Sequence, residues 1–404
     1  MADSGFFDLC IPPWRANKPP TILVGVTHAQ TCLVLGARVR ALRNAGFHVI
    51  LLSSPGPLLE ITAARERVER IAIPMQRSIA PIADLVALYR LWQLIGKYRP
   101  DLVEFSTPKA GLLGTFAAWL RGVPRRVYML RGLKLETTSG FKRRVLLAAE
   151  QLAARCAHVV LCNSESLRAE ALALRLAPAS KLRLLGEGSS NGVDIERFSP
   201  GPSPVREQLG IPQSVPVIGF SGRLTRDKGL PELCKAFDRI LSAEPSTRLL
   251  LVGWFDVAED ALDPGFRTRI LSHPNIYCTG FVHDTAPYYR AMDLFVLPTW
   301  REGFPNVVLE AAATGLPVIT TESTGARDSV LPEVTGLLIP PGYPDAICEA
   351  VMKLIRDPQR RQHMGRAARA WILEHFVESR VVGMTVDYYK TLLNDRLVTA
   401  LQSA

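Results

Sequence analysis

Two glutamates and two basic residues in the second half of the chain have the types and spacing for chemistry. Glu302 and Glu310 are separated by seven residues, and Arg223 and Lys228 lie about eighty positions earlier. Two cations can neutralise a diphosphate and the charge that develops on a leaving group. Carboxylates accept hydrogen bonds from ribose and sugar hydroxyls. Together the four residues favour binding of a phosphorylated sugar, although a solvated turn and a solvated helix face would explain the glutamates alone equally well.

The elements that must position the glutamates are a strand and a helix. The apolar run 293–297 predicts a buried strand, and residues 307–314 predict a helix. Pro305 suits the first turn of that helix because it lacks an N–H group. Gly303 lets the chain turn and lets a ligand approach the backbone. Since a helix N-terminus attracts anions, the segment between strand and helix suits a phosphate.

The two cations lie in a loop after another predicted strand, 215–220. This loop contains Gly222, Arg223 and Lys228 and leads into a helix predicted from residue 230. It matches neither the Walker pattern nor the dinucleotide pattern G-x-G-x-x-G. Its chemistry therefore depends on the pairing with the two glutamates.

Strands and helices alternate along most of the chain, which predicts an α/β fold of two doubly wound, Rossmann-like domains facing a cleft. The boundary falls near the turn-rich stretch 199–204, giving domains at 1–200 and 201–380 and a helix at 381–404 that returns to the first domain. Ligands bind beyond the carboxyl ends of strands in such folds. The loops after two first-domain strands therefore supply candidates for a ligand cleft: Thr27, His28 and Gln30 after one strand, and Thr107 and Lys109 after the other.

Length and composition fit two globular domains. The chain has 404 residues, of which 48% are hydrophobic and 21% charged. Its seven cysteines form no C-x-x-C pair, which favours a reducing cytoplasm over a disulfide framework or a zinc site. No run of about 18 uncharged apolar residues is present, and the first residues lack the pattern of a secretory signal. We therefore expect a cytoplasmic protein.

The positive charge is concentrated in the first half. Residues 1–200 hold 27 Lys and Arg against 15 Asp and Glu, a balance of +12, whereas the whole chain carries +10. This asymmetry favours contact of the first domain with a polyanion or an anionic membrane. A solvated charged surface is the alternative. The candidate lipid contacts are basic residues near the end or start of predicted helices: Arg90, Lys97, Arg99, Lys142, Arg143 and Arg144.

The phrases FSGRLTRDKG (220–229) and EGFPNVVLE (302–310) resemble the signature pair of the family-4 retaining glycosyltransferases, which have the GT-B fold. The second phrase matches the E-x7-E motif of that family. The first-half phrases PKAGLLG (108–114), LRGLKLET (130–137) and GSSNGVD (188–194) resemble the subgroup that extends sugars on polyprenyl diphosphates. That subgroup builds surface polysaccharides and glycan precursors.

The resemblance implies a nucleotide-sugar donor, expected to be UDP-linked, and an undecaprenyl-diphosphate-linked sugar as acceptor. The residues expected to bind this acceptor are Thr27, His28, Thr107 and Lys109. It implies that Arg223 and Lys228 bind the donor diphosphate, Glu310 the ribose and Glu302 the donor sugar. It further implies donor contacts of Gly222, Val282, Gly303, Phe304 and Asn306. Many relatives have a histidine where this chain has Arg131, and Arg131 is expected to contact the donor phosphate or the acceptor diphosphate. No D-x-D motif occurs, so no metal or other cofactor is expected.

Other functions are compatible with parts of the pattern. A nucleotide-sugar epimerase, a phosphorylase or a GT-B enzyme with a soluble acceptor would use the same fold. A non-catalytic polyanion binder would fit the basic charge, but the chain has no recognised nucleic-acid reader motif and no stacking aromatic cluster. Nucleic acid is therefore not an expected partner.

Overall fold

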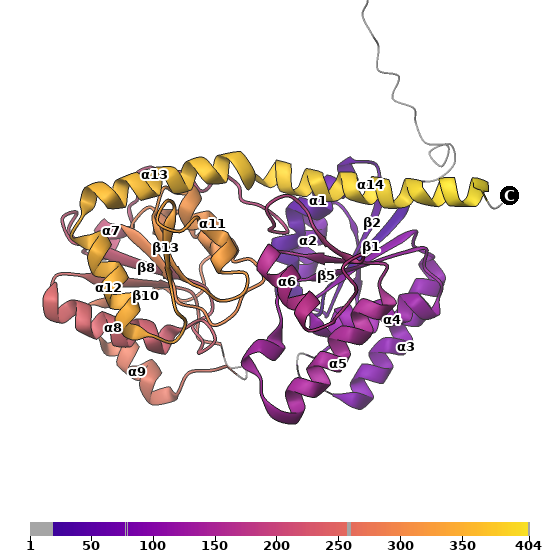
Figure 1. Cartoon of the computed structure of the whole chain (residues 1–404), viewed down its shortest axis with the longest axis horizontal. Coiled ribbons are helices and arrows are strands. Elements are labelled where there is room, and N and C mark those ends of the chain that lie inside the picture. The colour runs from indigo at the N-terminus through magenta and orange to yellow at the C-terminus, as the bar shows by residue number, and fades with distance from the viewer. Residues whose placement is uncertain (1–18, 77, 79, 257–259, 403–404) are drawn as a thin grey trace, which may run out of the picture. The chain divides into compact units, whose positions relative to one another are not determined.

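Two parallel β-sheets form the framework of the chain (Figure 1). The computed structural model describes residues 19–76, 78, 80–256 and 260–402, and side chains of the last helix as far as residue 394. One sheet has seven strands in the order β3-β2-β1-β4-β5-β6-β7, and the other has six in the order β10-β9-β8-β11-β12-β13. Both orders are those of doubly wound, Rossmann-like domains, so the predicted fold class is confirmed.

The seven-stranded sheet is formed by strands that alternate with helices in the first half of the chain. Its strands are β1 (Thr21–Gly25), β2 (His48–Ser53), β3 (Glu69–Ala72), β4 (Leu102–Ser106), β5 (Arg125–Leu130), β6 (Val159–Cys162) and β7 (Leu182–Leu184). The helices between them are η2 (Ala29–Leu35), α1 (Gly36–Asn44), α2 (Pro57–Glu66), α3 (Pro81–Tyr98), α4 (Pro108–Leu120), η3 (Lys134–Thr137), α5 (Gly140–Cys156) and α6 (Glu165–Ala173).

The six-stranded sheet follows the short helix α7 (Val205–Gln208). Its strands are β8 (Val217–Ser221), β9 (Arg248–Val252), β10 (Ile276–Cys278), β11 (Leu294–Leu297), β12 (Val318–Thr321) and β13 (Gly336–Ile339). The helices are α8 (Leu230–Ala243), α9 (Pro264–Ser272), α10 (Ala286–Tyr289), α11 (Asn306–Ala313), η4 (Arg327–Ser329), α12 (Pro344–Ile355), α13 (Pro358–His375) and α14 (Glu378–Gln402). Figure 1 shows α8 and α12 together on one side of this sheet and α11 and α13 on the other.

The chain folds into two compact units. The first contains the described residues up to Met129, Leu152–Val159 and the helix from Gly383, and the second contains Leu130–Gln151 and Val160–Val382. The domain boundaries predicted near residues 200 and 380 stay predictions. The strand order reverses between β1 and β4 in one sheet and between β8 and β11 in the other. Ligands of doubly wound folds bind outside the carboxyl ends of strands at such reversals. A ligand-binding site is therefore expected at the loops after β8 and β11.

The local structure differs from the sequence prediction in three places. The sequence pattern of residues 33–45 predicts one helix, but the 3-10 helix η2 ends at Leu35 and α1 begins only at Gly36. Helix α2 was not expected, because its apolar positions are only weakly periodic. Pro305 is the N-cap of α11 and not a residue of its first turn, since its ψ of 107° is extended and proline restricts only φ. Serine is a preferred helix cap, so the sequence predicts that Ser164 caps the helix after β6; this is confirmed, because its hydroxyl accepts a hydrogen bond from Leu167 N at 3.2 Å.

Candidate functional site

The loop after β8 carries the first predicted cation. Gly222 has a φ of +141°, which favours glycine at this turn. Arg223 directs Nη1 to Asp256 Oδ2 at 2.9 Å and Nη2 to Asp227 Oδ2 at 3.5 Å. Burial lowers the pKa of Arg223, but Asp227 and Asp256 outweigh it and raise the pKa above its ordinary value. The guanidinium is therefore cationic and held at the carboxyl end of β8, where a phosphate could exchange with its carboxylate partners.

The second cation meets the first glutamate of the motif. Lys228 Nζ contacts Glu302 Oε1. Both side chains are largely buried, with exposed fractions of 18% for Lys228 and 13% for Glu302. Arg301, the residue before Glu302, pairs with Asp227 Oδ2 at 3.1 Å. The loops after β8 and β11 are thus joined by ion pairs, as the strand order requires. The structure brings Lys228 and Glu302 together, whereas the sequence placed them 74 positions apart.

The backbone around Gly303 is closely packed within the second unit. A Cβ atom at Gly303 would lie only 2.2 Å from the carbonyl oxygen of Arg131, so no other residue fits there. Arg131 follows β5, and its Nη1 donates to Ser190 Oγ at 2.8 Å. Arg131 therefore lies beside the Glu302 segment, and its expected contact with a phosphate stays a prediction. Phe304 and Asn306 follow at the start of α11; Phe304 is buried against Phe376, whereas Asn306 is half-buried.

Glu310, the second glutamate, lies on α11 and has a partner that the sequence did not indicate. The Tyr289 hydroxyl donates to Glu310 Oε2 at 2.8 Å. Burial raises the pKa of the Glu310 carboxyl to about 7, although the bond from Tyr289 and the charge of Arg197 act in the opposite direction. Tyr289 also hydrogen-bonds Ser221, the last residue of β8, and burial raises its own pKa well above the usual value. The Tyr289 phenol thus links the end of β8, just before Gly222, to Glu310.

Val282 lies at the turn after β10. It is half-buried and packs against the core of the second unit. Its neighbour Phe281 is 51% exposed and makes an edge contact with Trp254, with ring centroids 5.5 Å apart. This turn is one strand away from the β8 loop, since β9 lies between β10 and β8.

The predicted acceptor residues lie together at the carboxyl ends of β1 and β4. Thr27 Oγ1 and Thr107 Oγ1 are 2.7 Å apart. His28 caps η2, where its ring accepts a hydrogen bond from Gln30 N. Lys109 Nζ pairs with Asp84 Oδ1 at 2.6 Å. Thr27 and Lys109 therefore stabilise the local fold, and their expected contact with a ligand stays a prediction.

The predicted lipid contacts are all on the surface. Arg90 and Lys97 are exposed on α3, and Arg99 is its exposed C-cap. Lys142, Arg143 and Arg144 are exposed in the first turns of α5. Within the part of the chain that the structure describes, no helix is both long and apolar enough to cross a bilayer. In the same residues, no three His, Cys, Asp or Glu side chains are grouped as a metal site would need.

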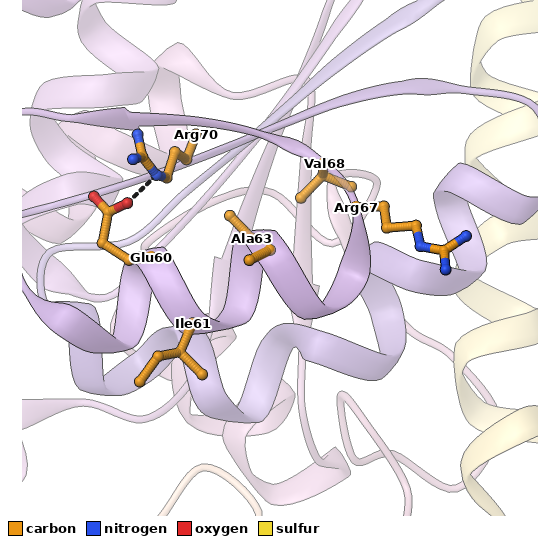
Figure 2. A pocket seen from close by; sticks show the side chains of 7 residues that line it. Glu60, Ile61, Ala63, Arg67, Val68 and Arg70 are labelled. Carbon is orange, nitrogen blue, oxygen red and sulfur yellow. Dashed lines mark ion pairs between the residues drawn. The ribbon is translucent and has the colours of Figure 1, made fainter.

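A pocket of about 510 Å³ lies between α2 and β3 (Figure 2). Its lining includes Ile61, Ala63 and Val68, with an ion pair between Glu60 and Arg70 at its edge. None of the predicted site residues lines it. It therefore does not belong to the donor or acceptor chemistry predicted from the sequence.

The sequence missed the partners of the predicted residues: Tyr289, Asp227 and Asp256. Asp227 lies inside the quoted FSGRLTRDKG phrase and could have been suspected as a partner for Arg223 four positions earlier. Tyr289 and Asp256 carry no local signal, because their roles depend on contacts with residues far away in sequence.

Comparisons with known proteins agree with the two-part organisation. Residues 34–188 match a family described as "Glycosyl transferase 4-like domain", and residues 215–357 match one described as "Glycosyl transferases group 1". The capsular polysaccharide biosynthesis glycosyltransferase CapM of Staphylococcus aureus is 35% identical over 371 residues, covering 92% of this chain and 97% of that protein. A UDP-Gal:alpha-D-GlcNAc-diphosphoundecaprenol alpha-1,3-galactosyltransferase of Escherichia coli is 28% identical and covers 78% of this chain and 82% of its own length.

Solved structures show the same fold. HepE of Anabaena in complex with UDP-glucose superposes with a TM-score of 0.77 at 22% identity, covering 92% of this chain and 99% of HepE. Sucrose-phosphate synthase from Thermosynechococcus elongatus superposes with a TM-score of 0.76 at 20% identity, covering 93% of this chain and all of that one. At these identities the likeness concerns the fold alone.

Proposed function

This chain belongs to the GT-B glycosyltransferases that combine a glycosyl transferase 4-like domain with a glycosyl transferases group 1 domain. From this we propose that it transfers a sugar from a nucleotide diphosphate to a lipid-linked acceptor. The donor is a UDP-linked hexose or N-acetylhexosamine. The acceptor is a hydroxyl of a sugar on polyprenyl diphosphate, in bacteria undecaprenyl diphosphate, and the product extends a polysaccharide or glycan precursor. Transfer proceeds with retention of the anomeric configuration and without a metal ion.

The contact between Lys228 and Glu302 carries this proposal. It places a cation suited to a diphosphate against a carboxylate suited to sugar hydroxyls, at the end of two neighbouring strands. Arg223 lies in the same loop as Lys228 and supplies the second cation. Glu310 accepts hydrogen bonds from the ribose, and the turn at Val282 meets the base. In the bound state the donor phosphates replace the carboxylate partners of the two cations.

The reaction exchanges one bond at the anomeric carbon. The bond to the diphosphate oxygen breaks, the bond to the acceptor oxygen forms on the same face, and the acceptor proton passes to the departing diphosphate. The transition state has oxocarbenium character, as in other glycosyl transfers. Arg223, Lys228 and the N-terminus of α11 stabilise the negative charge that develops on the diphosphate.

The acceptor side of the proposal uses residues that follow β1, β4 and β5. Thr27, His28, Thr107 and Lys109 meet the acceptor, and Arg131 contacts a phosphate of the donor or of the acceptor. The Escherichia coli relative is named for transfer to a sugar on diphosphoundecaprenol, which supports this acceptor class. The protein acts at the cytoplasmic face of the membrane, where exposed basic residues such as Arg90 and Lys142 attract anionic lipid at about 1 kcal/mol each.

The proposal is tested by incubating a panel of nucleotide sugars with polyprenyl-diphosphate-linked mono- and disaccharides. The assay examines the donor, the acceptor, the anomeric outcome and the need for metal. We expect transfer with one donor class, unchanged turnover after treatment with EDTA, and a product anomer that matches the donor in NMR spectra. Conversion of the donor in the absence of any acceptor would instead indicate an epimerase. Inversion at the anomeric carbon, or dependence on added metal, would contradict the retaining, metal-free mechanism.

A further inference from the structure

Helix α3 has two apolar faces, of which one is exposed. Ala87, Leu91 and Ile95 are buried and belong to the core beside the seven-stranded sheet. On the opposite side, the exposed fractions are 83% for Ile82, 66% for Leu85, 46% for Val86 and 57% for Tyr89. These four residues, the α3 stripe, are spaced i, i+3, i+4 and i+7, so they form one continuous face of the helix.

An exposed apolar face of this kind is expected to bind a partner or a membrane, because soluble proteins rarely expose contiguous large apolar side chains. Continuing along α3 on the same face, the next positions are Gln93 and Lys97, which are exposed, with Arg90 exposed at the flank. The face is therefore apolar in the first half of the helix and polar in the second, with one cation on it and one at its flank. Apolar side chains with adjacent cations are the composition of helices that lie in the interface of an anionic membrane.

The α3 stripe begins close to the residues proposed to bind the acceptor. Asp84, beside Leu85 in sequence, pairs with Lys109 Nζ at 2.6 Å. Lys109 lies in the first turn of α4, two residues after Thr107, whose hydroxyl meets that of Thr27. Asp84 lies on the side of α3 that faces away from the stripe, so a bilayer in contact with the stripe would be separated from the proposed acceptor residues by the width of this helix, roughly 10–12 Å.

We propose that the α3 stripe inserts into the interface of an anionic lipid bilayer, with Arg90 and Lys97 on the lipid phosphates. The inference rests on the proposed function, since a polyprenyl-linked acceptor resides in such a bilayer. A second copy of the chain is a poorer occupant. A two-fold contact brings the same surface of both copies together, so the stripe of the other copy would supply no anion for Arg90 and Lys97, whereas lipid phosphates would.

Vesicle flotation with phosphatidylcholine alone and with added phosphatidylglycerol tests this docking. We expect the wild type to float with the anionic vesicles, and Ile82→Ser/Leu85→Ser to lower the partition coefficient about tenfold or more. Arg90→Gln/Lys97→Gln should also weaken binding to anionic vesicles. The difference from the wild type should be larger at low salt than at high salt, because salt screens the two charges. The matched control is Ile61→Ser/Leu271→Ser, which alters side chains that are 54% and 55% exposed elsewhere and should float like the wild type.

A second variant reports insertion directly. Tyr89→Trp should add emission that shifts to shorter wavelength with anionic vesicles, relative to the wild-type spectrum. Unchanged flotation of Ile82→Ser/Leu85→Ser, or a Tyr89→Trp signal that vesicles do not shift, would overturn the proposal. So would a vesicle-free dimer in light scattering that the double serine variant abolishes, because the stripe would then belong to a second copy.

Activity separates this inference from the proposed function. Ile82→Ser/Leu85→Ser should keep its turnover with a short-chain, water-soluble diphosphate-linked sugar and lose turnover with a long-chain acceptor in vesicles. If the wild type uses neither acceptor, the proposed function fails, and the flotation result still decides whether the stripe binds lipid. Equal loss on both acceptors would show that the stripe acts on the fold and would contradict docking.

Discussion

The Tyr289 hydroxyl donates a hydrogen bond to Glu310 Oε2 at 2.8 Å, and the tyrosine is wholly buried. Two further groups act on this pair. Ser221 of β8 bonds the phenol, and Arg197 acts on the carboxyl through its charge. From α13, Arg369 reaches the other end of α11 at the carbonyl of Ala313. The packed strands β11 and β12 carry no titratable residue. Glu310 is thus an acid whose ionisation depends chiefly on burial and on one phenol.

The first prediction concerns the pH dependence of donor binding. Because burial raises the pKa of Glu310 to about 7, the carboxyl is largely protonated below that pH and ionised above it. An ionised carboxylate accepts the stronger hydrogen bonds from ribose hydroxyls. We therefore expect the KM for the donor to fall as pH rises through about 7. Glu310→Gln is the control and should lack this change; an identical profile in this variant would assign the titration to another group.

The second prediction concerns Tyr289→Phe. The bond from Tyr289 lowers the pKa of Glu310, so its loss should raise that pKa and move the midpoint of the KM profile to higher pH. The alkaline plateau of kcat should stay near the wild-type value. Tyr288→Phe, a half-buried neighbour, serves as the matched control. A midpoint that does not move, in a variant with normal thermal unfolding, would leave Tyr289 a packing residue only.

The third prediction tests the cation that meets Glu302. Lys228→Ala removes a charge that the proposed transition state needs, so kcat should fall by about 10²- to 10³-fold, the cost typical of losing one such group. Lys235→Ala, an exposed lysine of α8, should leave kcat unchanged. Steady-state kinetics with saturating donor makes the comparison. Turnover that survives the loss of Lys228 would remove this residue from the phosphate site.

The sequence predicts some of these features and not others. The alternation of apolar runs and turns predicted both sheets, because buried parallel strands need uninterrupted apolar segments. That Lys228 and Glu302 belong to one site was predicted from two phrases that resemble a family pattern, but their ion pair was not predicted. The bond between Tyr289 and Glu310 could not be foreseen, since it depends on how α10 and α11 pack. Helix α2 was missed for a related reason: its place is decided by tertiary packing, and its own pattern is weak.

The last prediction concerns a buried charge cluster in the first unit. Glu104 on β4 accepts from Arg38 Nη1 at 2.5 Å and from the Tyr389 hydroxyl on α14 at 2.6 Å, and Arg38 and Glu104 are wholly buried. Glu104→Gln removes the carboxylate charge that faces the buried guanidinium, and such a loss costs about 3–5 kcal/mol of unfolding free energy. Tyr389→Phe removes one bond to a charged group and should cost about 1.5–3 kcal/mol.

Denaturant unfolding of the full chain measures both losses. The control is Asp387→Asn, which breaks the exposed pair with Lys390 on the same helix and should cost at most about 1 kcal/mol. The three variants should therefore rank Glu104→Gln, Tyr389→Phe and Asp387→Asn in decreasing effect. If Glu104→Gln were no more costly than Asp387→Asn, the buried cluster would contribute nothing to holding α14 on its unit.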